Sequence, residues 1–276
     1  MKRSERLVDM TKYLMGQPHV LIPLPFFAKR YGAAKSSISE DLTILKHTLA
    51  SRQDGILETV AGAAGGVRYI PFWGKKHAEE FLTDLSSRLE DSNRILAGGF
   101  IYLSDILGNP NDLRKLGKLI ATRYAYSNIN VVMTIETKGI SLAQAVAYYL
   151  NVPFVIARKR SKVTEGATVS VNYISSSIDR VSKMELPTRA LKKDSNVLLV
   201  DDYMMAGGTL TGMQKLAKEF DSNIAGICVL CEADFDHVKL LDNYLSLIKI
   251  SKIDTAKKII LARPGSFIAH TDFDRF

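Results

Sequence analysis

The 276-residue sequence predicts an α/β protein in which a small N-terminal unit, residues 1–74, precedes a larger parallel-sheet domain, residues 75–276. In the first unit, three helical patterns are followed by two β-like runs around a glycine-rich turn. In the second, short apolar runs alternate with helical patterns, which is typical of a parallel sheet covered by helices. Residues 71–76, which contain a proline and a glycine, mark the expected junction.

The first unit begins with three helical patterns. Apolar residues at helical spacing predict helices over residues 7–14 and 26–31, and a third that begins at Ser36 or Ser37. Ser37 and Glu40 resemble a capping box, in which two side chains satisfy free N–H groups at a helix start. The second and third helices are joined by a short turn, as in a helix–turn–helix.

A β-hairpin completes this unit. The β-like runs 56–60 and 67–70 flank the glycine-rich turn 61–66. Three helices and a hairpin predict a winged helix–turn–helix, whose third helix would lie in the major groove of double-stranded DNA, with basic side chains near phosphates. A helical cap that mediates only protein contacts is the alternative. The predicted DNA-binding residues are Arg3, Lys35, Ser36, Ser37, Ser39, Lys46 and Arg68.

The composition is that of an ordinary globular protein, with 46% hydrophobic and 24% charged residues. No apolar run has the length of a membrane span and the N-terminus lacks a signal-peptide core, so we expect a cytoplasmic protein with no membrane partner. A net charge of +8 favours an anionic partner. Cys228 and Cys231 lie in an apolar, strand-like run, where core thiols are expected rather than a redox pair or zinc site. The histidines show no metal-ligand spacing.

The second domain is expected to begin with a connecting helix over residues 75–89. A strand over 96–103 is predicted after this helix, at the start of the second domain proper, and a helix over 113–124 would follow. A second buried strand is predicted at 131–135, and a helix over 140–150 comes after it.

Glu136–Gly139 lies between that second strand and its helix. Freed backbone N–H groups and a lysine make this turn suited to phosphate. A third strand over 152–157 ends at Arg158 and Lys159. Since parallel strands present their carboxyl ends at one edge of a sheet, these groups should meet in one crevice.

Residues 161–193 are polar, rich in serine and threonine, and long for a plain connection. They predict either a mobile segment over the crevice or a disordered linker. No base-binding element can be identified between residues 158 and 193 or near the C-terminus. A late strand is predicted over 245–250.

The strongest motif lies within residues 196–211. Val197–Val200 predicts a buried strand that ends at Asp201 and Asp202. Ala206–Thr209 then opens a helix, and its glycines, hydroxyl and helix N-terminus predict a phosphate site. Two carboxylates before this loop would repel a bare phosphate, but they would accept hydrogen bonds from the vicinal hydroxyls of a ribose 5-phosphate. An acidic strand end with no ligand is the alternative.

This combination resembles the phosphoribosyl pyrophosphate (PRPP) motif of type I phosphoribosyltransferases. The pattern is not a P-loop, because no Gly-Lys-Ser/Thr follows. The resemblance implies that the acid pair holds the ribose hydroxyls, that the Gly-Gly-Thr loop holds the 5′-phosphate, and that Glu136–Gly139 receives pyrophosphate. It also implies that a flexible hairpin within 161–193 closes over the substrate. Many relatives place a polar or basic residue where Met204 and Met205 stand, so phosphate binding here would rest on backbone N–H groups and Thr209.

A winged-helix head on such a domain resembles the purine operon repressors of Gram-positive bacteria over nearly the whole chain. The resemblance rests on residues 35–41, 61–66, 136–139 and 201–209. It implies a homodimeric repressor of purine synthesis genes, bound to operator DNA and released by PRPP. The predicted effector-binding residues are Glu136, Thr137, Lys138, Gly139, Arg158, Lys159, Asp201, Asp202, Tyr203, Met204, Met205, Ala206, Gly207, Gly208 and Thr209.

We expect no enzymatic activity, because the elements that would orient an attacking base are not recognisable. No required cofactor and no dedicated metal site are expected, although Mg²⁺ could accompany pyrophosphate. Two alternatives stay open. One is an active purine phosphoribosyltransferase with a DNA-binding head. The other is a regulator whose main effector is guanosine tetra- or pentaphosphate, with Tyr203 stacked on the purine.

Overall fold

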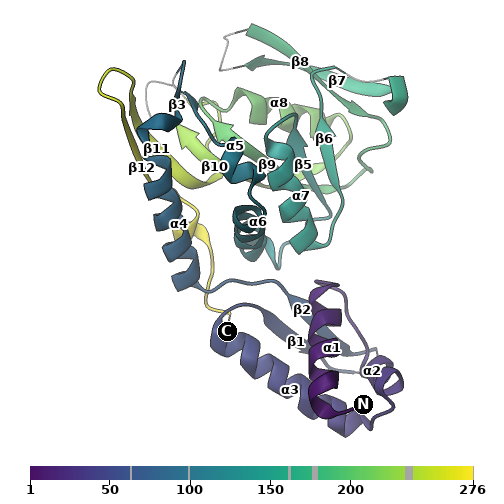
Figure 1. Ribbon diagram of the computed structural model, residues 1–276. Coiled ribbons are helices and arrows are strands. Elements are labelled where there is room, and N and C mark those ends of the chain that lie inside the picture. The colour runs from purple at the N-terminus through teal and green to yellow at the C-terminus, as the bar shows by residue number, and fades with distance from the viewer. Residues whose placement is uncertain (63, 99, 161–162, 176–179, 234–238, 276) are drawn as a thin grey trace.

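The structure is a computed structural model that describes residues 1–62, 64–98, 100–160, 163–175, 180–233 and 239–275. A small N-terminal head lies beside a larger body, and the C-terminus returns to the junction between them (Figure 1). Parts of three predicted segments lie outside the described residues: one residue of the 61–66 turn, one of the 96–103 strand, and several of the 161–193 segment.

The head contains three helices and a hairpin, in the predicted order. They are α1 (Arg3–Met15), α2 (Leu24–Tyr31), α3 (Lys35–Arg52), β1 (Ile56–Val60) and β2 (Gly66–Ile70), the two strands being antiparallel. Met10, Phe27 and Ile38 bring one residue from each helix into a single apolar core, which Tyr69 of β2 completes. Buried apolar side chains at helical spacing therefore hold the three helices of the head together, as the sequence pattern predicts.

The predicted start of α3 is wrong by one to two residues. The helix begins at Lys35, and its N-cap is Ala34, which makes no side-chain capping hydrogen bond. Gly32 adopts a left-handed conformation (φ 58°) that ends α2, and the chain regains helical geometry soon after it. Ser37 consequently lies inside the first turn, so the predicted capping box does not form.

The body is built on a six-stranded sheet in the order β12-β11-β10-β9-β5-β6, with β9 near its centre. All neighbours run parallel except β11 and β12. The strands are β5 (Val131–Ile135), β6 (Phe154–Ala157), β9 (Asn196–Met204), β10 (Asn223–Ala233), β11 (Leu245–Asp254) and β12 (Ile259–Pro264).

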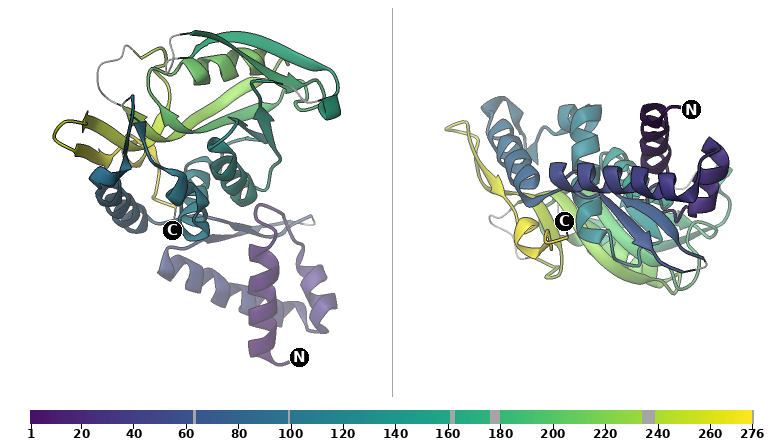
Figure 2. Two further views of the ribbon diagram at one scale, coloured as in Figure 1. Left: turned by 45° about the horizontal axis from the view of Figure 1, so that its top comes forward. Right: turned by 90° about the horizontal axis from the view of Figure 1, so that it is seen from below.

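Helices cover both faces of this sheet (Figures 1 and 2). One face packs on α4 (Lys75–Leu89), α6 (Pro110–Tyr124) and α7 (Gly139–Leu150), and the other packs on α8 (Gly208–Lys218). Side chains of β9 alternate accordingly: Leu198 and Val200 join the first apolar cluster, whereas Val197 and Leu199 join the second. The strand is buried on both sides, which explains its continuous apolar sequence.

The predicted strand over 96–103 is wrong. The structure instead has β3 (Ile95–Leu96) and β4 (Phe100–Ile101), which form a separate two-stranded antiparallel sheet, followed by the short helix α5 (Ser104–Gly108). Gly98 has a positive φ of 78°, and this turn interrupts the apolar run. Residues 95–103 therefore form a small hairpin outside the main sheet, which we call the hood.

The segment 161–193 contains a regular hairpin of β7 (Thr168–Ser175) and β8 (Arg180–Pro187). It packs on α8, where Tyr173 and Met184 lie so close to Gly212 that a Cβ there would approach within 2.6 Å of Met184. The backbones of Arg158 and Glu185 exchange two hydrogen bonds, of 2.9 and 2.7 Å, which join this hairpin to the end of β6. Three short 3-10 helices complete the described elements, η1 (Ser92–Arg94), η2 (Val163–Glu165) and η3 (Ile268–His270).

Specific contacts hold the head against α6. Lys118 of α6 donates to the carbonyl oxygen of Asp54 at 2.8 Å and also to its carboxylate. The backbone N–H of Trp73 donates to Thr122 Oγ1 at 2.9 Å. Phe72 packs with Ile70 of the head and Ala125 of the body in a small apolar cluster. The junction thus combines an ion pair with apolar burial.

Candidate functional site

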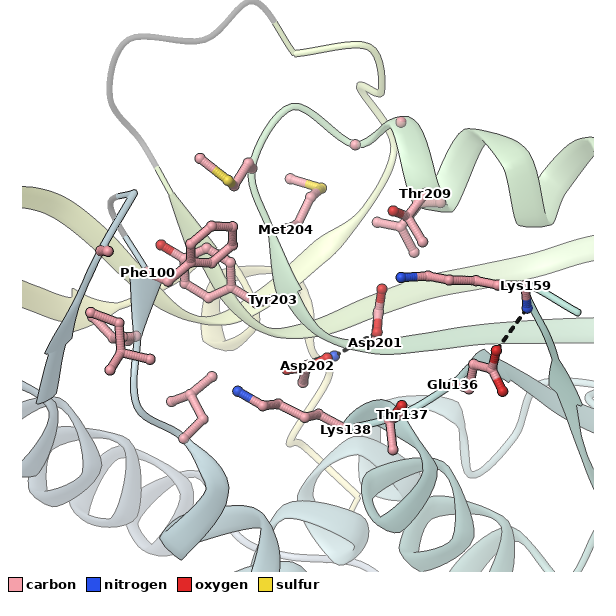
Figure 3. A pocket seen from close by; sticks show the side chains of 18 residues that line it. Phe100, Glu136, Thr137, Lys138, Lys159, Asp201, Asp202, Tyr203, Met204 and Thr209 are labelled. Atoms are coloured by element: carbon pink, nitrogen blue, oxygen red, sulfur yellow. Dashed lines mark hydrogen bonds between the residues drawn. The ribbon is translucent and has the colours of Figure 1, made fainter. Parts of the chain in front are cut away.

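A cavity of about 470 Å³ opens at the carboxyl ends of β5 and β9 (Figure 3). β5 leads into α7 on one face of the sheet, and β9 leads into α8 on the other. The loops that follow the two strands therefore diverge and leave a crevice, which is where open α/β sheets bind ligands.

Two aspartates form the floor of the cavity. They do not end β9 as predicted, because the strand continues to Met204 and still pairs Asp201 with Val229 of β10. Asp201 is only 5% exposed, and one of its carboxylate oxygens accepts the N–H of Asp202 at 3.0 Å. Burial, and then the charge of Asp202, raise the pKa of Asp201 well above its ordinary value. Burial also raises the pKa of Asp202, although Lys138 opposes that shift.

Gly139, the first residue of α7, approaches this acid pair closely. A Cβ at residue 139 would lie 2.9 Å from Asp201 Oδ1 and 2.4 Å from Thr134 Oγ1, so a larger residue would displace the helix. The hydroxyl of Thr134 is buried and has no hydrogen-bond partner among the described residues. The N-terminus of α7 therefore lies beside Asp201, where its dipole favours negative charge.

The loop after β9 has the geometry of an anion site. Gly207 adopts the left-handed conformation (φ 88°) and serves as the N-cap of α8, which begins at Gly208. Gly207, Gly208 and Thr209 all line the cavity. The free N–H groups at the start of α8 and the Thr209 hydroxyl can thus reach an anion without a charged side chain.

Two lysines bring positive charge to the cavity, from the ends of β5 and β6. Figure 3 shows Lys138 extending toward Asp202, and Lys159 extending toward Asp201 and ending beside its carboxylate. The backbone N–H of Lys159 donates to a carboxylate oxygen of Glu136 at 2.8 Å, which fixes that loop. A ligand with anionic groups at both ends would meet a lysine at either side of the acid pair.

Most of the predicted effector residues come together in this cavity. Arg158 does not line it and is instead paired with Glu136 at 3.4 Å and Glu165 at 2.8 Å. Gly139 and Ala206 are adjacent but contribute no lining surface. The predicted residues that line the cavity are Glu136, Thr137, Lys138, Lys159, Asp201, Asp202, Tyr203, Met204, Met205, Gly207, Gly208 and Thr209.

Sequence reasoning missed the hood, which covers the far end of the cavity. Its lining side chains are all apolar: Leu96, Ala97, Phe100, Ile101 and Leu103. The Phe100 ring lies 5.9 Å from the Tyr203 ring at 48° (Figure 3). The adjacent glycines at 98 and 99 were the available indication that this apolar run turns back instead of crossing the sheet.

The predicted DNA-binding residues fall into two places. Lys35, Ser36, Ser39 and Lys46 are exposed and Ser37 is half-buried on α3. This helix lies on the side of the head turned away from the body (Figures 1 and 2). The exposed residues follow a helical repeat along one stripe, the geometry that a groove-binding helix needs.

Arg3 and Arg68 are held in ion pairs. Arg3 donates at 2.9 Å to the buried carboxylate of Asp41, which ties α1 to α3 beside the exposed stripe. Arg68 is paired with Glu58 at 2.6 Å and lines a second cavity, of about 490 Å³, at the junction with the body. The structure therefore places Arg68 against the body and not beside α3.

Other predicted features can be compared with the described residues. Cys228 and Cys231 are buried and free, and burial raises the pKa of both thiols, which confirms core thiols. Within the described ranges, no three His, Cys, Asp or Glu side chains are grouped as metal ligands. In the same part of the chain, no helix is long and apolar enough to cross a membrane.

Comparison with known protein families identifies the domain type of the head and of the body. Residues 2–71 match the model of the bacterial purine repressor N-terminal domain, and residues 103–261 match that of the phosphoribosyl transferase domain. Adenine phosphoribosyltransferase from Thermoanaerobacter pseudethanolicus shares the fold of the body, with 21% identity and a TM-score of 0.51 over 60% of this chain and 98% of that one. The molecule is thus a repressor-type head joined to a phosphoribosyltransferase-fold domain.

Full-length relatives establish the family. The Bacillus subtilis purine biosynthesis transcriptional repressor PurR is 54% identical over 97% of this chain and 94% of its own length. The Lactococcus lactis (strain IL1403) purine biosynthesis transcriptional activator PurR is 47% identical over 96% of this chain and 98% of its own length. The chain belongs to the PurR family of transcriptional regulators of purine biosynthesis.

Proposed function

We propose that this chain is a homodimeric repressor of purine biosynthesis genes, bound to double-stranded operator DNA through α3 and released by PRPP bound in the body without turnover. One observation carries the proposal. A single cavity combines the acid pair of β9, the phosphate-suited start of α8 and Lys138, in a chain that belongs to a family of purine regulators.

PRPP fits the distribution of charge in the cavity. Its ribose hydroxyls would donate to Asp201 and Asp202, whose pKa values burial raises, and would thereby replace hydrogen bonds to water that burial removes. Its 5′-phosphate would accept N–H groups from Gly207–Thr209. Its pyrophosphate would lie near Lys138 and Glu136–Thr137. A Mg²⁺ ion carried by the pyrophosphate would lessen repulsion from the acid pair.

The hood supports a binding site without turnover. Transfer of the ribosyl group requires a base held in line with the ribose C1 atom, and such alignment supplies roughly 7–11 kcal/mol in favourable cases. The described hood residues that line the cavity all have apolar side chains, so stacking on Phe100 or Tyr203 would leave the base free to rotate in its plane. A sensor also gains from leaving its effector intact.

A second effector is favoured by the same aromatic pair. Guanosine tetra- or pentaphosphate would place its purine against Phe100 and Tyr203 at the apolar end, and its phosphates at the loops that follow β5 and β9. PRPP and the guanosine phosphates would then compete for the cavity. An active purine phosphoribosyltransferase with a DNA-binding head is the remaining alternative.

Repression and not activation is part of the proposal. The B. subtilis relative is named a repressor and the L. lactis relative an activator, so members of the family can either repress or activate transcription. Whether transcription is repressed or activated would depend on where the operator lies relative to the promoter, and repression is expected where the two overlap.

The route from cavity to head would run through α7 and α6. α7 begins at the pyrophosphate loop, and its last residue, Leu150, lines the junction cavity beside His19 of the head. The two helices cross closely, because a Cβ on Gly117 of α6 would lie 2.7 Å from the carbonyl oxygen of Ala145 of α7. A shift of α7 on ligand binding would therefore move α6 and its contact with Asp54. Release of DNA requires that the effector favour one head position over the other.

Calorimetric titration tests the effector assignment. PRPP with Mg²⁺ should bind the purified protein at one site per chain, and guanosine tetraphosphate should displace it. Absence of PRPP binding would contradict the proposal, and binding of both ligands at once would contradict the shared cavity.

A further inference from the structure

A buried polar cluster lies beside the phosphate loop, at the carboxyl end of β10. Its centre is Glu232, which is 4% exposed. One carboxylate oxygen of Glu232 accepts a hydrogen bond from Lys239 Nζ at 2.7 Å and another from the Tyr244 hydroxyl. The other oxygen accepts from Ser246 Oγ at 2.9 Å. Three donors from the segment between β10 and β11, and from β11 itself, thus converge on one carboxylate.

Glu232 is negatively charged and Lys239 positively charged near neutral pH, because the pKa of Glu232 is lowered and that of Lys239 is raised. Burial acts to raise the pKa of Glu232, but the hydrogen bonds from Lys239, Tyr244 and Ser246 outweigh it and hold that pKa below its ordinary value. Burial and Glu232 raise the pKa of Tyr244 to about 12, so the phenol remains a donor. A buried carboxylate with charge-assisted hydrogen bonds fixes the positions of its donors.

The residues that follow Lys239 lie against the phosphate loop. The backbone N–H of Leu240 donates to the carbonyl oxygen of Ala206 at 2.8 Å. Leu241 is buried in the same apolar cluster as Met204, and its Cβ lies 3.3 Å from the position of a Cβ on Gly207. The loop is therefore supported from outside the cavity by a segment that Glu232 anchors.

The support matters because the loop would bind phosphate mainly through its backbone. Gly207 is in the left-handed conformation, and Met205 brings no charge. Affinity then depends on how well the N–H groups are held in place before the ligand arrives.

We propose that Glu232 is a positioning residue for the phosphate loop. Its ion pair with Lys239 fixes Leu240 and Leu241, which hold Ala206 and Gly207 in the geometry that receives a ribose 5′-phosphate. This inference rests on the proposed effector function of the same cavity. It assigns Glu232 no contact with the ligand.

The test compares three probes on Glu232→Gln, which keeps the shape of the side chain and removes its charge. Affinities for ribose 5-phosphate and for PRPP should each fall about tenfold, the loss expected for a disrupted charged hydrogen bond. Affinity for inorganic pyrophosphate, which would use the Glu136–Lys138 loop, should stay unchanged. A general loosening of the domain would not separate the probes in this way.

Matched variants complete the design. Asp254→Asn removes a carboxylate that is paired with Lys252 at 3.7 Å on β11, away from the loop, and should bind every probe like the parental protein. Lys239→Met, which removes the ion pair with Glu232 and a hydrogen bond to Tyr244, should also weaken both ribose ligands. The double variant should lose less affinity than the sum of the two single losses, because both changes remove the same ion pair. If Glu232→Gln does not fold, Tyr244→Phe removes one donor and should weaken ribose 5-phosphate several-fold.

A folded Glu232→Gln protein with parental affinity for ribose 5-phosphate would overturn the inference. An equal loss of pyrophosphate affinity would overturn it as well, since the effect would not be specific to the phosphate loop. If the parental protein binds neither ribose 5-phosphate nor PRPP, the proposed effector function is wrong. The positioning role of Glu232, which depends on that function, is then wrong as well.

Discussion

Asp201 and Asp202 are adjacent acidic residues on the floor of the cavity, and their burial opposes ionisation of both. Asp201 is buried beneath the first turn of α7, and Asp202 lies opposite Lys138. A ligand that donates hydroxyl hydrogens to the pair would replace the solvation that burial removes. The acid pair is therefore where effector binding should be most sensitive to a single substitution.

The double substitution Asp201→Ala and Asp202→Ala should abolish the response to PRPP while it leaves operator binding intact. The reason is that the pair faces the cavity in the body, whereas the exposed stripe of α3 lies in the head. Gel-shift titration with and without PRPP measures both properties. A folded double variant that PRPP still releases from DNA would show that the site is elsewhere.

Asp201→Asn alone should stabilise the protein at alkaline pH. Because the folded-state pKa of Asp201 is raised above the unfolded value of about 3.9, the folded protein binds this proton more tightly than the unfolded chain. Stability should then fall as pH rises from about 4 through the raised pKa, and the variant should lack that loss. Thermal unfolding should show a higher midpoint for the variant at pH near 8 than for the parent, with the difference vanishing below about pH 4. A variant that is equally destabilised at both pH values would contradict the assigned cause.

Residue types predicted the anion-binding half of the cavity better than its apolar half. Acidic pairs, glycines and lysines after short apolar runs have few structural explanations, so their positions could be inferred from spacing. Arg158 is an exception, because its charge suited a phosphate but it forms ion pairs with Glu136 and Glu165, which its sequence position does not indicate. Arg68 is a similar case, since the sequence does not show which face of the hairpin meets the body.

At the scale of elements, β5, α4 and the hairpin β1–β2 follow their sequence patterns closely, because local periodicity and burial agree along them. The hood does not. Its apolar residues resemble a strand, yet they turn back at Gly98, and Ile101 and Leu103 are buried against the apolar core on one face of the sheet instead of pairing with a strand of it. The Phe100 ring packs against Tyr203 of β9, a contact between residues distant in sequence. The start of α3 was misplaced because serine and glutamate at capping spacing also occur inside helices.

The exposed stripe of α3 predicts strongly salt-dependent DNA binding. Lys46→Met should lower affinity across sequences and reduce the slope of log affinity against log salt by about one, since one phosphate contact is lost. Lys218→Met, which removes an exposed lysine from α8 in the body, is the matched control and should leave the slope unchanged. The slopes come from fluorescence anisotropy at several salt concentrations. Equal slopes for Lys46→Met and the parental protein would argue against groove binding by α3.

Arg68 is predicted to behave differently from Lys46. Its guanidinium donates to Glu58 beside the junction cavity, so Arg68→Met should alter the salt slope little and lower the thermal midpoint of the protein instead. The same anisotropy series, together with thermal unfolding, measures both effects. If Arg68→Met reduced the slope of log affinity against log salt as much as Lys46→Met does, Arg68 would have to contact DNA, which would contradict this prediction.

For the whole molecule, the proposed release of DNA depends on the contact between head and body. Lys118 is 8% exposed, and burial lowers its pKa although Asp54 of the head opposes the shift. A buried lysine whose carboxylate partner belongs to the other unit favours one relative position of the two units more than it favours overall stability.

Lys118→Met should therefore weaken the coupling between effector and DNA. The variant keeps the apolar stem and loses the ion pair, so PRPP should still bind but should change operator affinity several-fold less than in the parental protein. Calorimetry for PRPP and gel shifts for DNA separate the two effects. An unchanged PRPP response in this variant would show that the signal does not pass through the contact of α6 with Asp54.

The most direct measurement is the affinity of the purified protein for DNA from upstream of a purine biosynthesis gene, with and without PRPP and Mg²⁺. A parallel incubation with adenine, guanine, hypoxanthine and xanthine would be analysed by chromatography for nucleoside monophosphates. We predict that PRPP weakens DNA binding and that no nucleotide accumulates. DNA affinity indifferent to PRPP, or turnover near about 1 per second as in ordinary enzymes, would contradict the account.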